Sequence, residues 1–205
     1  MYKLSPSSLS LMEKCTRCFW LYVVKKISRP SAGFPSLPNG VDKMLKEHFD
    51  RFRDNNELPP ELNELKELKN VKLFGDKELL RGWRNNLKGV EHYDEENDLL
   101  IHGAVDNLLV KGNKLIVLDY KTRGFALKED TAHYYQDQLD IYNFLLRKNG
   151  YETEDYAYLL FYMPEKVLET GEFVFKTELV KMQVDIEHVE WLIKKALNII
   201  KGKMP

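Results

Sequence analysis

Hydrophobic residues recur at helical spacing in the first half of the chain and change to short strand-like runs in the second half. After Ser5 and Pro6, a capping side chain followed by proline, this spacing predicts a first helix over residues 6–26. Three prolines and two glycines then predict a loop over residues 28–40. The spacing resumes in a second helix, which we expect over residues 41–52.

Two shorter and strongly charged stretches, 61–69 and 76–88, are expected to form a helical insertion over residues 57–88 that lies on the core. The pattern changes near Val90, where short hydrophobic runs begin. The remaining elements are predicted as strands over 90–93, 99–110 and 114–121, a helix from Thr131 to before Gly150, strands over 156–163 and 173–182, and a last helix from Asp185 to about Ile200.

This order of elements is helix, three strands, helix and further strands, which indicates the α/β class with a mixed sheet flanked by helices. The 205 residues suit a single domain over residues 1–205, and 43% hydrophobic residues are enough for a packed core.

Charge and cysteine content narrow the classes of function. Lys and Arg number 31 against 32 Asp and Glu, so a generally basic nucleic-acid coat is excluded and any polyanion must bind at a local basic surface. Two cysteines do not suggest a disulfide-stapled secreted module. Without a signal-like segment or a run of ~18–20 apolar residues, we expect a cytoplasmic protein that does not enter the membrane.

The candidate chemistry lies on a predicted hairpin. If Gly112 and Asn113 form its two-residue turn, Asp106 faces Asp119, and side-chain alternation places Lys121 on the same face as both carboxylates. Opposed like charges destabilise a sheet, and a bound cation removes the conflict. Carboxylates favour hard cations, which makes Mg²⁺ or Mn²⁺ the expected ion.

The alternative is a surface hairpin whose polar residues simply face water. Against it, residues 115–118 form a continuous apolar run of the kind that is buried on both faces of a sheet. An acid and a lysine at the end of such a strand favour a functional site.

Several short motifs of the chain, taken in order, resemble those of the PD-(D/E)XK nuclease superfamily. The motifs Gly-x-x-Asp and Asp-x-Lys are similar to residues 103–106 and 119–121, and residues 138–142 resemble the Gln-x-x-x-Tyr motif of the RecB-like branch. The stretch 40–48, which ends in a histidine, and the segment 5–19 also resemble this branch. The resemblance implies a restriction-endonuclease-like core of αβββαβ order, with an added N-terminal helix and the small helical insertion.

The resemblance also implies roles for individual residues. Asp106 and Asp119 would bind the metal ion, together with His48 and the backbone carbonyl of Tyr120. Lys121 would position or deprotonate the attacking water and stabilise negative charge on the phosphorus centre.

Histidine offers two candidates for the metal site. His102 shares the strand face of Asp106, but four strand residues span ~13 Å, too far for both to bind one ion. His48 is therefore the favoured ligand, and His102 is expected at the edge of the cleft. A histidine on an apolar helix face is also common as a core residue, which is the alternative for His48.

Four further residues are candidates for binding the substrate. Gln138 and Tyr142 share one helix face and could contact the nucleic-acid strand, although a tyrosine in this apolar helix could equally belong to the core. Arg123 follows Lys121 with the same strand parity and is the best candidate for a phosphate contact, with Arg17 as a second one.

Cys15 and Cys18 share one face of the first helix. Some RecB-like members, including CRISPR-associated ones, hold an iron–sulfur cluster, but two thiolates do not complete a four-ligand set. We therefore expect no iron–sulfur cluster and a structural role for both cysteines.

These features predict a metal-dependent DNase that prefers single strands or free duplex ends, in the manner of an exonuclease. The preference for ends rests on the resemblance, as do a helicase or CRISPR adaptation proteins as partners. The alternative is a catalytically weak subunit that binds nucleic acid in a DNA repair or CRISPR adaptation complex.

Overall fold

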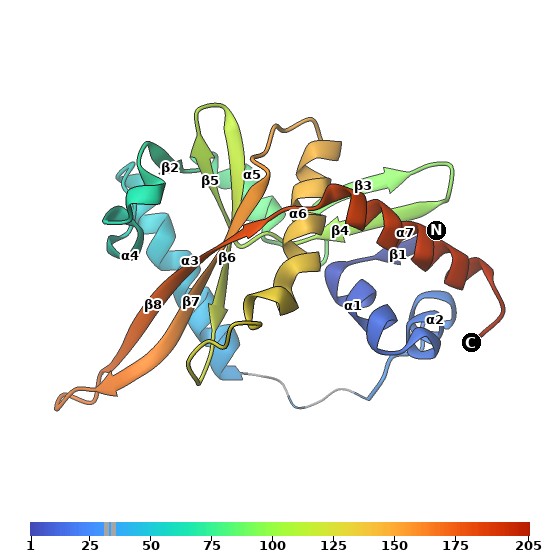
Figure 1. Cartoon of the computed structure of the whole chain (residues 1–205), viewed down its shortest axis with the longest axis horizontal. Coiled ribbons are helices and arrows are strands. Elements are labelled where there is room, and N and C mark those ends of the chain that lie inside the picture. Colours follow the sequence, from blue (N-terminus) through green and yellow to red (C-terminus); the bar gives the residue numbers. More distant parts are fainter. Residues whose placement is uncertain (31–32, 34–35) are drawn as a thin grey trace.

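The computed structural model describes residues 1–30, 33 and 36–205, and it folds into two β-sheets packed with helices (Figure 1). The larger, mixed sheet has the strand order β2-β5-β6-β7-β8, and the smaller one the order β1-β4-β3. The fold is therefore mixed α/β with a mixed sheet flanked by helices, as predicted. Its strands are β1 (Tyr2–Leu4), β2 (Val71–Leu73), β3 (Val90–Asp94), β4 (Leu99–Gly103), β5 (Asn107–Lys111), β6 (Lys114–Thr122), β7 (Tyr156–Val167) and β8 (Phe173–Gln183).

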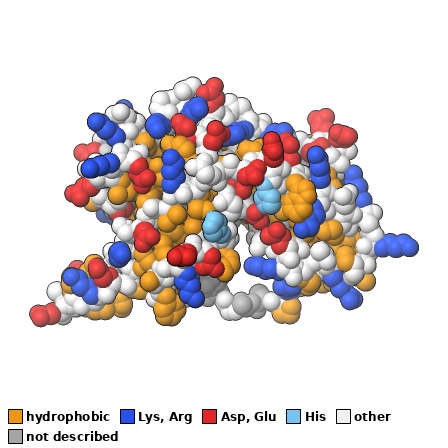
Figure 2. All heavy atoms as spheres, in the orientation of Figure 1, with side chains coloured by type: hydrophobic (Ala, Val, Ile, Leu, Met, Phe, Trp, Pro, Cys, Tyr) orange, Lys and Arg blue, Asp and Glu red, His pale blue; other side chains and the backbone are white. Residues whose placement is uncertain are grey.

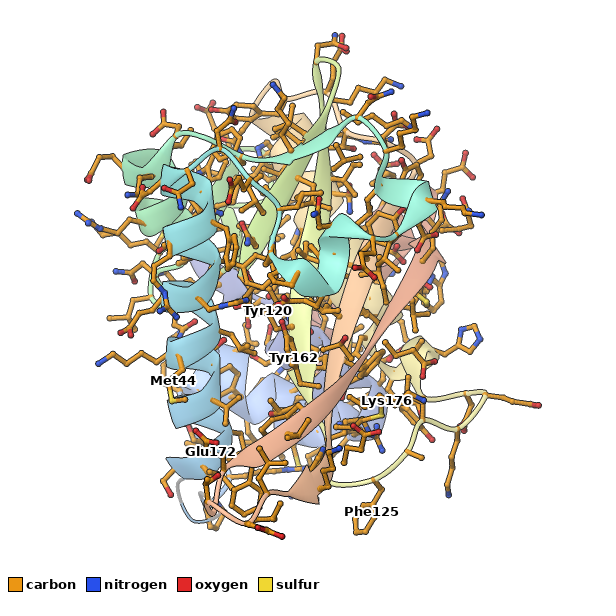
Figure 3. All side chains as sticks on the ribbon, turned by 90° about the vertical axis from the view of Figure 1, so that its left-hand side faces the viewer. Met44, Tyr120, Phe125, Tyr162, Glu172 and Lys176 are labelled. Carbon is orange, nitrogen blue, oxygen red and sulfur yellow. The ribbon has the colours of Figure 1, made fainter. Side chains whose placement is uncertain are left out.

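Helices cover both faces of the larger sheet, because alternate residues of its central strands are apolar on each side. The helices are α1 (Pro6–Lys14), α2 (Thr16–Lys25), α3 (Ser36–Asp54), α4 (Pro60–Asn63), α5 (Lys77–Trp83), α6 (Gln136–Lys148) and α7 (Ile186–Lys201), with short 3₁₀ turns η1 (Lys66–Leu68) and η2 (Ala132–Tyr135). Val117 of β6 belongs to the hydrophobic cluster with α1, α2, α6 and α7, whereas Tyr120 faces the cluster with α3 and α4. Figure 3 shows Tyr120 and Tyr162 on the side of the sheet that α3 covers.

The predicted first helix over residues 6–26 is two helices that meet at Cys15. The backbone of Cys15 is extended, with φ −165° and ψ 98°, so it cannot continue a helix. Its N–H donates to the carbonyl of Leu11, and its Sγ accepts from the N–H of Cys18 at 3.2 Å. Cys15 therefore caps the end of α1 and the start of α2.

The predicted loop over 28–40 lies partly outside the described residues, at 31–32 and 34–35. Its last five residues are helical, since α3 begins at Ser36 rather than Val41. Pro38 is tolerated because it lies in the first turn, where backbone N–H groups have no intrahelical partner.

The segment 57–88 is less helical than predicted. It contains the strand β2, which pairs antiparallel with β5 at the edge of the larger sheet. Thus the three strands of that sheet that precede α6 are β2, β5 and β6, whereas β3 and β4 pair in the smaller sheet.

The strand predicted over residues 99–110 is two strands, β4 and β5, which lie in different sheets. Between them, the N–H of Val105 donates to the carbonyl of Trp83 at 3.1 Å, so the chain leaves one sheet before it enters the other. Asp106 therefore lies just before β5 and is not part of its β-ladder with β6.

The other predicted elements are confirmed within a few residues. Asp185 caps α7, since its side chain accepts from the N–H of His188, and Gly150 follows α6 with a positive φ of 82°. Among the described residues, no helix is both long and apolar enough to cross a membrane.

Candidate active site

The central strand β6 brings Asp119 and Lys121 to one face of the larger sheet. Strand β6 pairs with β5 on one side and with β7 on the other, so its side chains are fixed in alternation. Asp119 is buried, at 1% exposure, and its carboxylate pairs with the ammonium group of Lys121. The Lys121 Nζ atom also lies 4.8 Å from the centre of the Tyr135 ring.

Asp106 lies beside Asp119, although it is not paired in the hairpin ladder, which ends at Asn107. The register is confirmed from the pair Lys111 and Lys114 to the pair Asn107 and Leu118. The next position places Asp106 against β6, where the N–H of Tyr120 points to its Oδ2 atom at 3.4 Å. Asp106 and Asp119 are therefore neighbouring carboxylates.

Burial sets the protonation chemistry of Asp119. The loss of solvation raises its pKa to about 7; the Lys121 ammonium opposes this rise and the charge of Asp106 adds to it. A cation bound between the two carboxylates would lower this pKa, because it stabilises the ionised form.

Helix α6 contributes Gln138 and Tyr142 to the same place. The Gln138 Nε2 atom donates to Asp119 Oδ1 at 3.1 Å and to the Tyr142 hydroxyl at 2.7 Å. Burial, followed by the charges of Asp119 and Asp106, raises the pKa of Tyr142 well above its usual value. The phenol therefore stays neutral.

The packing around Gly103 explains why a glycine stands three residues before Asp106. A Cβ atom at this position would lie 2.7 Å from Cε1 and 2.9 Å from Cδ1 of Tyr142. The close approach of β4 to the Tyr142 ring thus requires a residue without a side chain. The Gly-x-x-Asp motif and the Gln-x-x-x-Tyr motif are therefore in direct packing contact.

Asp106, Gln138 and Tyr142 line a cleft of about 1150 Å³ between the sheet and the α1–α2 pair. Asp119, which contacts Gln138, and Lys121, which pairs with Asp119, adjoin this lining. Figure 2 shows the surface hollowed in this region. Its charged lining is balanced, with the cations Lys3, Lys14, Lys46 and Arg123 and the carboxylates Glu13, Asp42, Asp106 and Asp137. The local surface is therefore mixed in charge rather than strongly basic, unlike the sequence-based expectation.

Helix α3 presents Lys46, not His48, to the site. Lys46 Nζ bridges two carboxylates, at 2.9 Å from Asp106 Oδ1 and 2.8 Å from Asp42 Oδ2. His48 is two residues further and so points about 200° around the helix. Its Nε2 atom lies 3.0 Å from Glu61 Oε1 of α4. His48 is therefore on the side of α3 that carries Phe52 and faces α4.

The structure therefore brings together Asp106, Asp119, Lys121, Gln138 and Tyr142, with Arg123 in the wall of the same cleft. It does not bring His48 to them. Arg17 is exposed on α2 and is not part of the cleft lining. His102 does line the cleft, at the edge where β4 ends.

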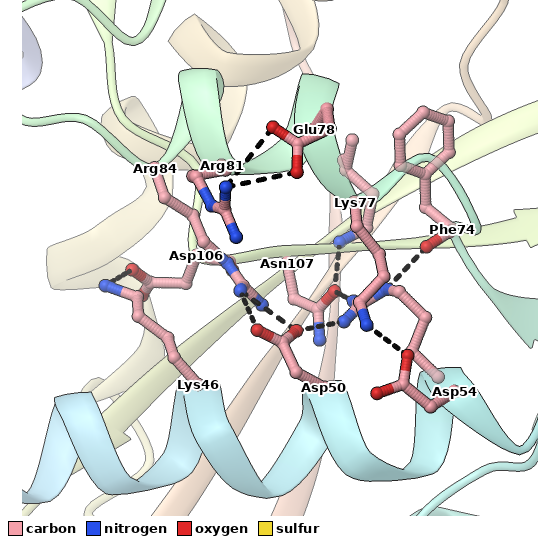
Figure 4. A network of polar contacts seen from close by, with 12 residues as sticks. Lys46, Asp50, Asp54, Phe74, Lys77, Glu78, Arg81, Arg84, Asp106 and Asn107 are labelled. Carbon is pink, nitrogen blue, oxygen red and sulfur yellow. Dashed lines mark hydrogen bonds and ion pairs between the residues drawn. The ribbon is translucent and has the colours of Figure 1, made fainter.

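Sequence reasoning missed Lys46 and the arginine network behind Asp106 (Figure 4). The Arg84 Nε atom donates to the backbone carbonyl of Asp106 at 2.7 Å, and its Nη1 donates to Asp50 at 2.7 Å. Arg53 pairs with the same Asp50 and donates to Asn107. A sequence signal for these contacts is the spacing of residues 42, 46 and 50 on one face of α3, but charged residues at this spacing also occur on ordinary solvated helix surfaces.

The donor set fits a divalent ion that prefers oxygen ligands. In the described part of the chain, no three His, Cys, Asp or Glu side chains gather closely enough for a metal site made of side chains alone. Asp106, Asp119 and the Tyr120 carbonyl nevertheless suit Mg²⁺, which keeps several water ligands and is usually held by one or two carboxylates. The ammonium groups of Lys46 and Lys121 lie against these carboxylates, so a metal ion would have to displace them.

Paired acidic residues and a lysine at the end of a buried strand are residue types that can serve metal-dependent phosphodiester hydrolysis. The model of the PD-(D/E)XK nuclease superfamily matches residues 3–204, so the chain belongs to this superfamily. Its members are generally nucleases that use divalent metals such as Mg²⁺, and the family indicates nuclease activity on a nucleic acid. A comparison with curated proteins found no match.

Proposed function

We propose that the chain is a Mg²⁺- or Mn²⁺-dependent deoxyribonuclease whose metal ion is held by Asp106, Asp119 and the Tyr120 carbonyl. The observation that carries the proposal is the buried Asp119 beside Lys121 and beside Asp106, which lines the cleft. When bound, the metal would polarise the scissile phosphodiester and lower the pKa of its water.

The side chains of the chain supply the rest of the chemistry. Lys121 can turn from Asp119 toward a phosphate oxygen, where its ammonium stabilises the negative charge that builds up during hydrolysis. Gln138 fixes the orientation of the Asp119 carboxylate through its 3.1 Å hydrogen bond. Arg123, in the cleft wall, is placed to contact a neighbouring phosphate of the strand.

A preference for single strands or free ends is supported by aromatic side chains in the cleft. Tyr134 is 76% exposed and Tyr22 is 42% exposed, and both line it. Exposed rings can stack on unpaired bases without regard to sequence, by about 1–3 kcal/mol per base. Kinship with the RecB-like branch and partnership with a helicase or CRISPR adaptation proteins are parts of the same proposal that rest on the short motifs alone. The cytoplasmic location, also proposed, rests on the sparse cysteines and the lack of a signal-like segment.

The test is cleavage of end-labelled DNA, single- and double-stranded, linear and circular, with Mg²⁺, Mn²⁺ or EDTA. We expect metal-dependent cutting of linear single strands, slower cutting of blunt duplexes, and loss of cutting in Lys121→Met. Lys114→Met is the matched control, because Lys114 lies at the other end of β6, outside the cleft. Equal cutting by Lys121→Met and wild type would remove Lys121 from the mechanism.

A second candidate is a subunit that binds nucleic acid without cutting it. The observation in its favour is that both carboxylates already carry lysine partners, which compete with a metal ion. Folded protein that binds single-stranded DNA but cuts no DNA or RNA with either metal would support this candidate over the nuclease.

A further inference from the structure

The two cysteines form a pair at the corner between α1 and α2, outside the cleft lining. The Sγ atoms of Cys15 and Cys18 lie 2.7 Å apart, and both side chains are partly exposed. A disulfide bond is about 2.0 Å long, so the sulfurs can bond after a shift of less than about 1 Å. A purely structural role does not require two thiols in such contact.

The start of helix α2 stabilises negative charge on Cys15. The N–H of Cys18 donates to Cys15 Sγ at 3.2 Å, in the first turn of the helix. The hydrogen bond between the two thiols, followed by that of the Cys18 N–H group, lowers the pKa of the Cys15 thiol to about 7. A large fraction of Cys15 is therefore thiolate near neutral pH, and the thiolate is the nucleophile.

Arg29 provides a cation for the second sulfur. Lys26 has a positive φ of 59° at the end of α2, and the N–H of Ile27 donates to the carbonyl of Leu21, so the chain turns back along the helix. This turn brings the guanidinium of Arg29 to Cys18, with Nη2 at 3.1 Å from Sγ. The Arg29 guanidinium also contributes to the lowered pKa of Cys15, so one cation serves both sulfurs.

We propose that Cys15 and Cys18 form a reversible thiol–disulfide exchange site whose substrates are low-molecular-weight disulfides such as glutathione disulfide. This inference goes beyond the proposed nuclease and does not depend on it. Cys15 is the attacking residue, and Cys18 with Arg29 is the resolving pair.

The exchange proceeds in two steps. The Cys15 thiolate attacks one sulfur of the disulfide, whose S–S bond breaks; a mixed disulfide forms, and the leaving thiolate takes up a proton. Cys18 then gives its proton to the solvent and attacks Cys15 Sγ, which releases the second thiolate to be protonated. The protein pair loses two electrons, the small disulfide gains two, and two small thiols are produced.

The experiment equilibrates the full-length protein in glutathione buffers of increasing disulfide content, blocks free thiols by alkylation, and weighs the intact chain. We expect both thiols to disappear together, with a mass lower by two hydrogens, and to return with excess dithiothreitol. Cys18→Ser should instead accumulate the mixed disulfide, one glutathionyl group heavier, because the resolving sulfur is absent.

Arg29→Gln should slow the second step several-fold, so that the mixed disulfide builds up transiently, and Arg29→Lys should restore part of the rate. Lys25→Gln is the matched control, because Lys25, a cation on the helix that carries Cys18, lies over the Trp20 ring and away from the sulfurs. The proposal is overturned if both thiols remain alkylatable at every glutathione disulfide content. It is equally overturned if wild type and Cys18→Ser accumulate the mixed disulfide alike.

Discussion

Two buried aspartates on neighbouring elements show how the surroundings of a single residue decide its role. Asp119 lies beside a second carboxylate, a lysine and the cleft-lining Gln138, whereas the partners of the fully buried Asp140 belong to α6 and to the start of α7. Asp140 Oδ1 accepts from Gln136 and from the backbone N–H of Asp185, which ties α6 to the start of α7. Its Oδ2 has no hydrogen-bond partner among the described residues.

Asp140 makes the stability of the protein depend on pH. Burial raises its pKa to about 6 in the folded state, above the usual aspartate value of 3.8. Between pH 4 and 6 the folded state therefore holds more protons than the unfolded state, and stability falls as pH rises through this window. A shift of this size corresponds to a loss of up to about 3 kcal/mol above pH 6.

Asp140→Asn keeps the Oδ1 acceptor and removes the charge. We expect the variant to be more stable than wild type at pH 8 and to show a flatter stability profile between pH 4 and 6. Urea unfolding at several pH values measures both effects. A variant whose stability profile keeps the slope of wild type would contradict this role of Asp140.

At the scale of elements, the site depends on an arginine network that joins α3, α5 and β5. Arg84 holds the backbone carbonyl of Asp106, and Asp50 holds Arg84 in turn (Figure 4). Because Asp106 lies outside the β-ladder, this contact is what fixes its backbone. Arg84 is therefore a positioning residue for Asp106, the proposed metal ligand.

Arg84→Met should lower the affinity for Mn²⁺ several-fold in calorimetry and reduce the free energy of unfolding by about 1–3 kcal/mol, since a buried carbonyl loses its donor. Arg81→Met is the matched control from the same helix, because its exposed guanidinium pairs only with the exposed Glu78. Loss of stability with unchanged Mn²⁺ affinity would mean that the network supports the fold and not the site.

The elements also show what the sequence can and cannot predict. The hairpin register follows from the turn at Gly112 and Asn113, because a two-residue turn fixes every pair that follows. The break after Gly103 depends on a partner that the local pattern does not contain, the Trp83 carbonyl. At Cys15 the capping partners are local, but the helical spacing of apolar residues continues across the break and hides it.

The rotation of α3 is set by tertiary packing. The Phe49 ring packs 4.7 Å from the Tyr120 ring, centre to centre, and this contact turns Lys46 toward Asp106 and His48 toward Glu61. A motif that ends in a histidine does not determine this rotation. The acidic residues and lysine of the site could therefore be predicted, and their partners on α3 could not.

At the scale of the whole molecule, the formal net charge is only −1, and the cleft is likewise close to neutral, with equal numbers of Lys or Arg and carboxylate side chains. Such a cleft attracts a polyanion only weakly by itself, and a divalent cation adds the missing positive charge.

We therefore expect the Lys121→Met variant to bind single-stranded DNA at least about tenfold more tightly with Ca²⁺ than with EDTA, a difference of about 1.4 kcal/mol. Fluorescence anisotropy of a labelled oligonucleotide measures this effect, and Mg²⁺-free monovalent salt of equal ionic strength is the control. Equal affinity in Ca²⁺ and EDTA would show that DNA binds without help from a metal ion.

The central claim is that Asp119 and its neighbours form a metal-dependent nuclease site. The most direct measurement is the initial rate of cleavage of linear single-stranded DNA in Mg²⁺ by wild type, Asp119→Asn and Asp140→Asn. Both variants replace a buried aspartate, but only Asp119 contacts Lys121 and Gln138. The account predicts that Asp119→Asn lowers the rate by a factor of at least about 10²–10³, while Asp140→Asn keeps the wild-type rate. Cleavage by Asp119→Asn at the wild-type rate, or equal loss in both variants, would contradict it.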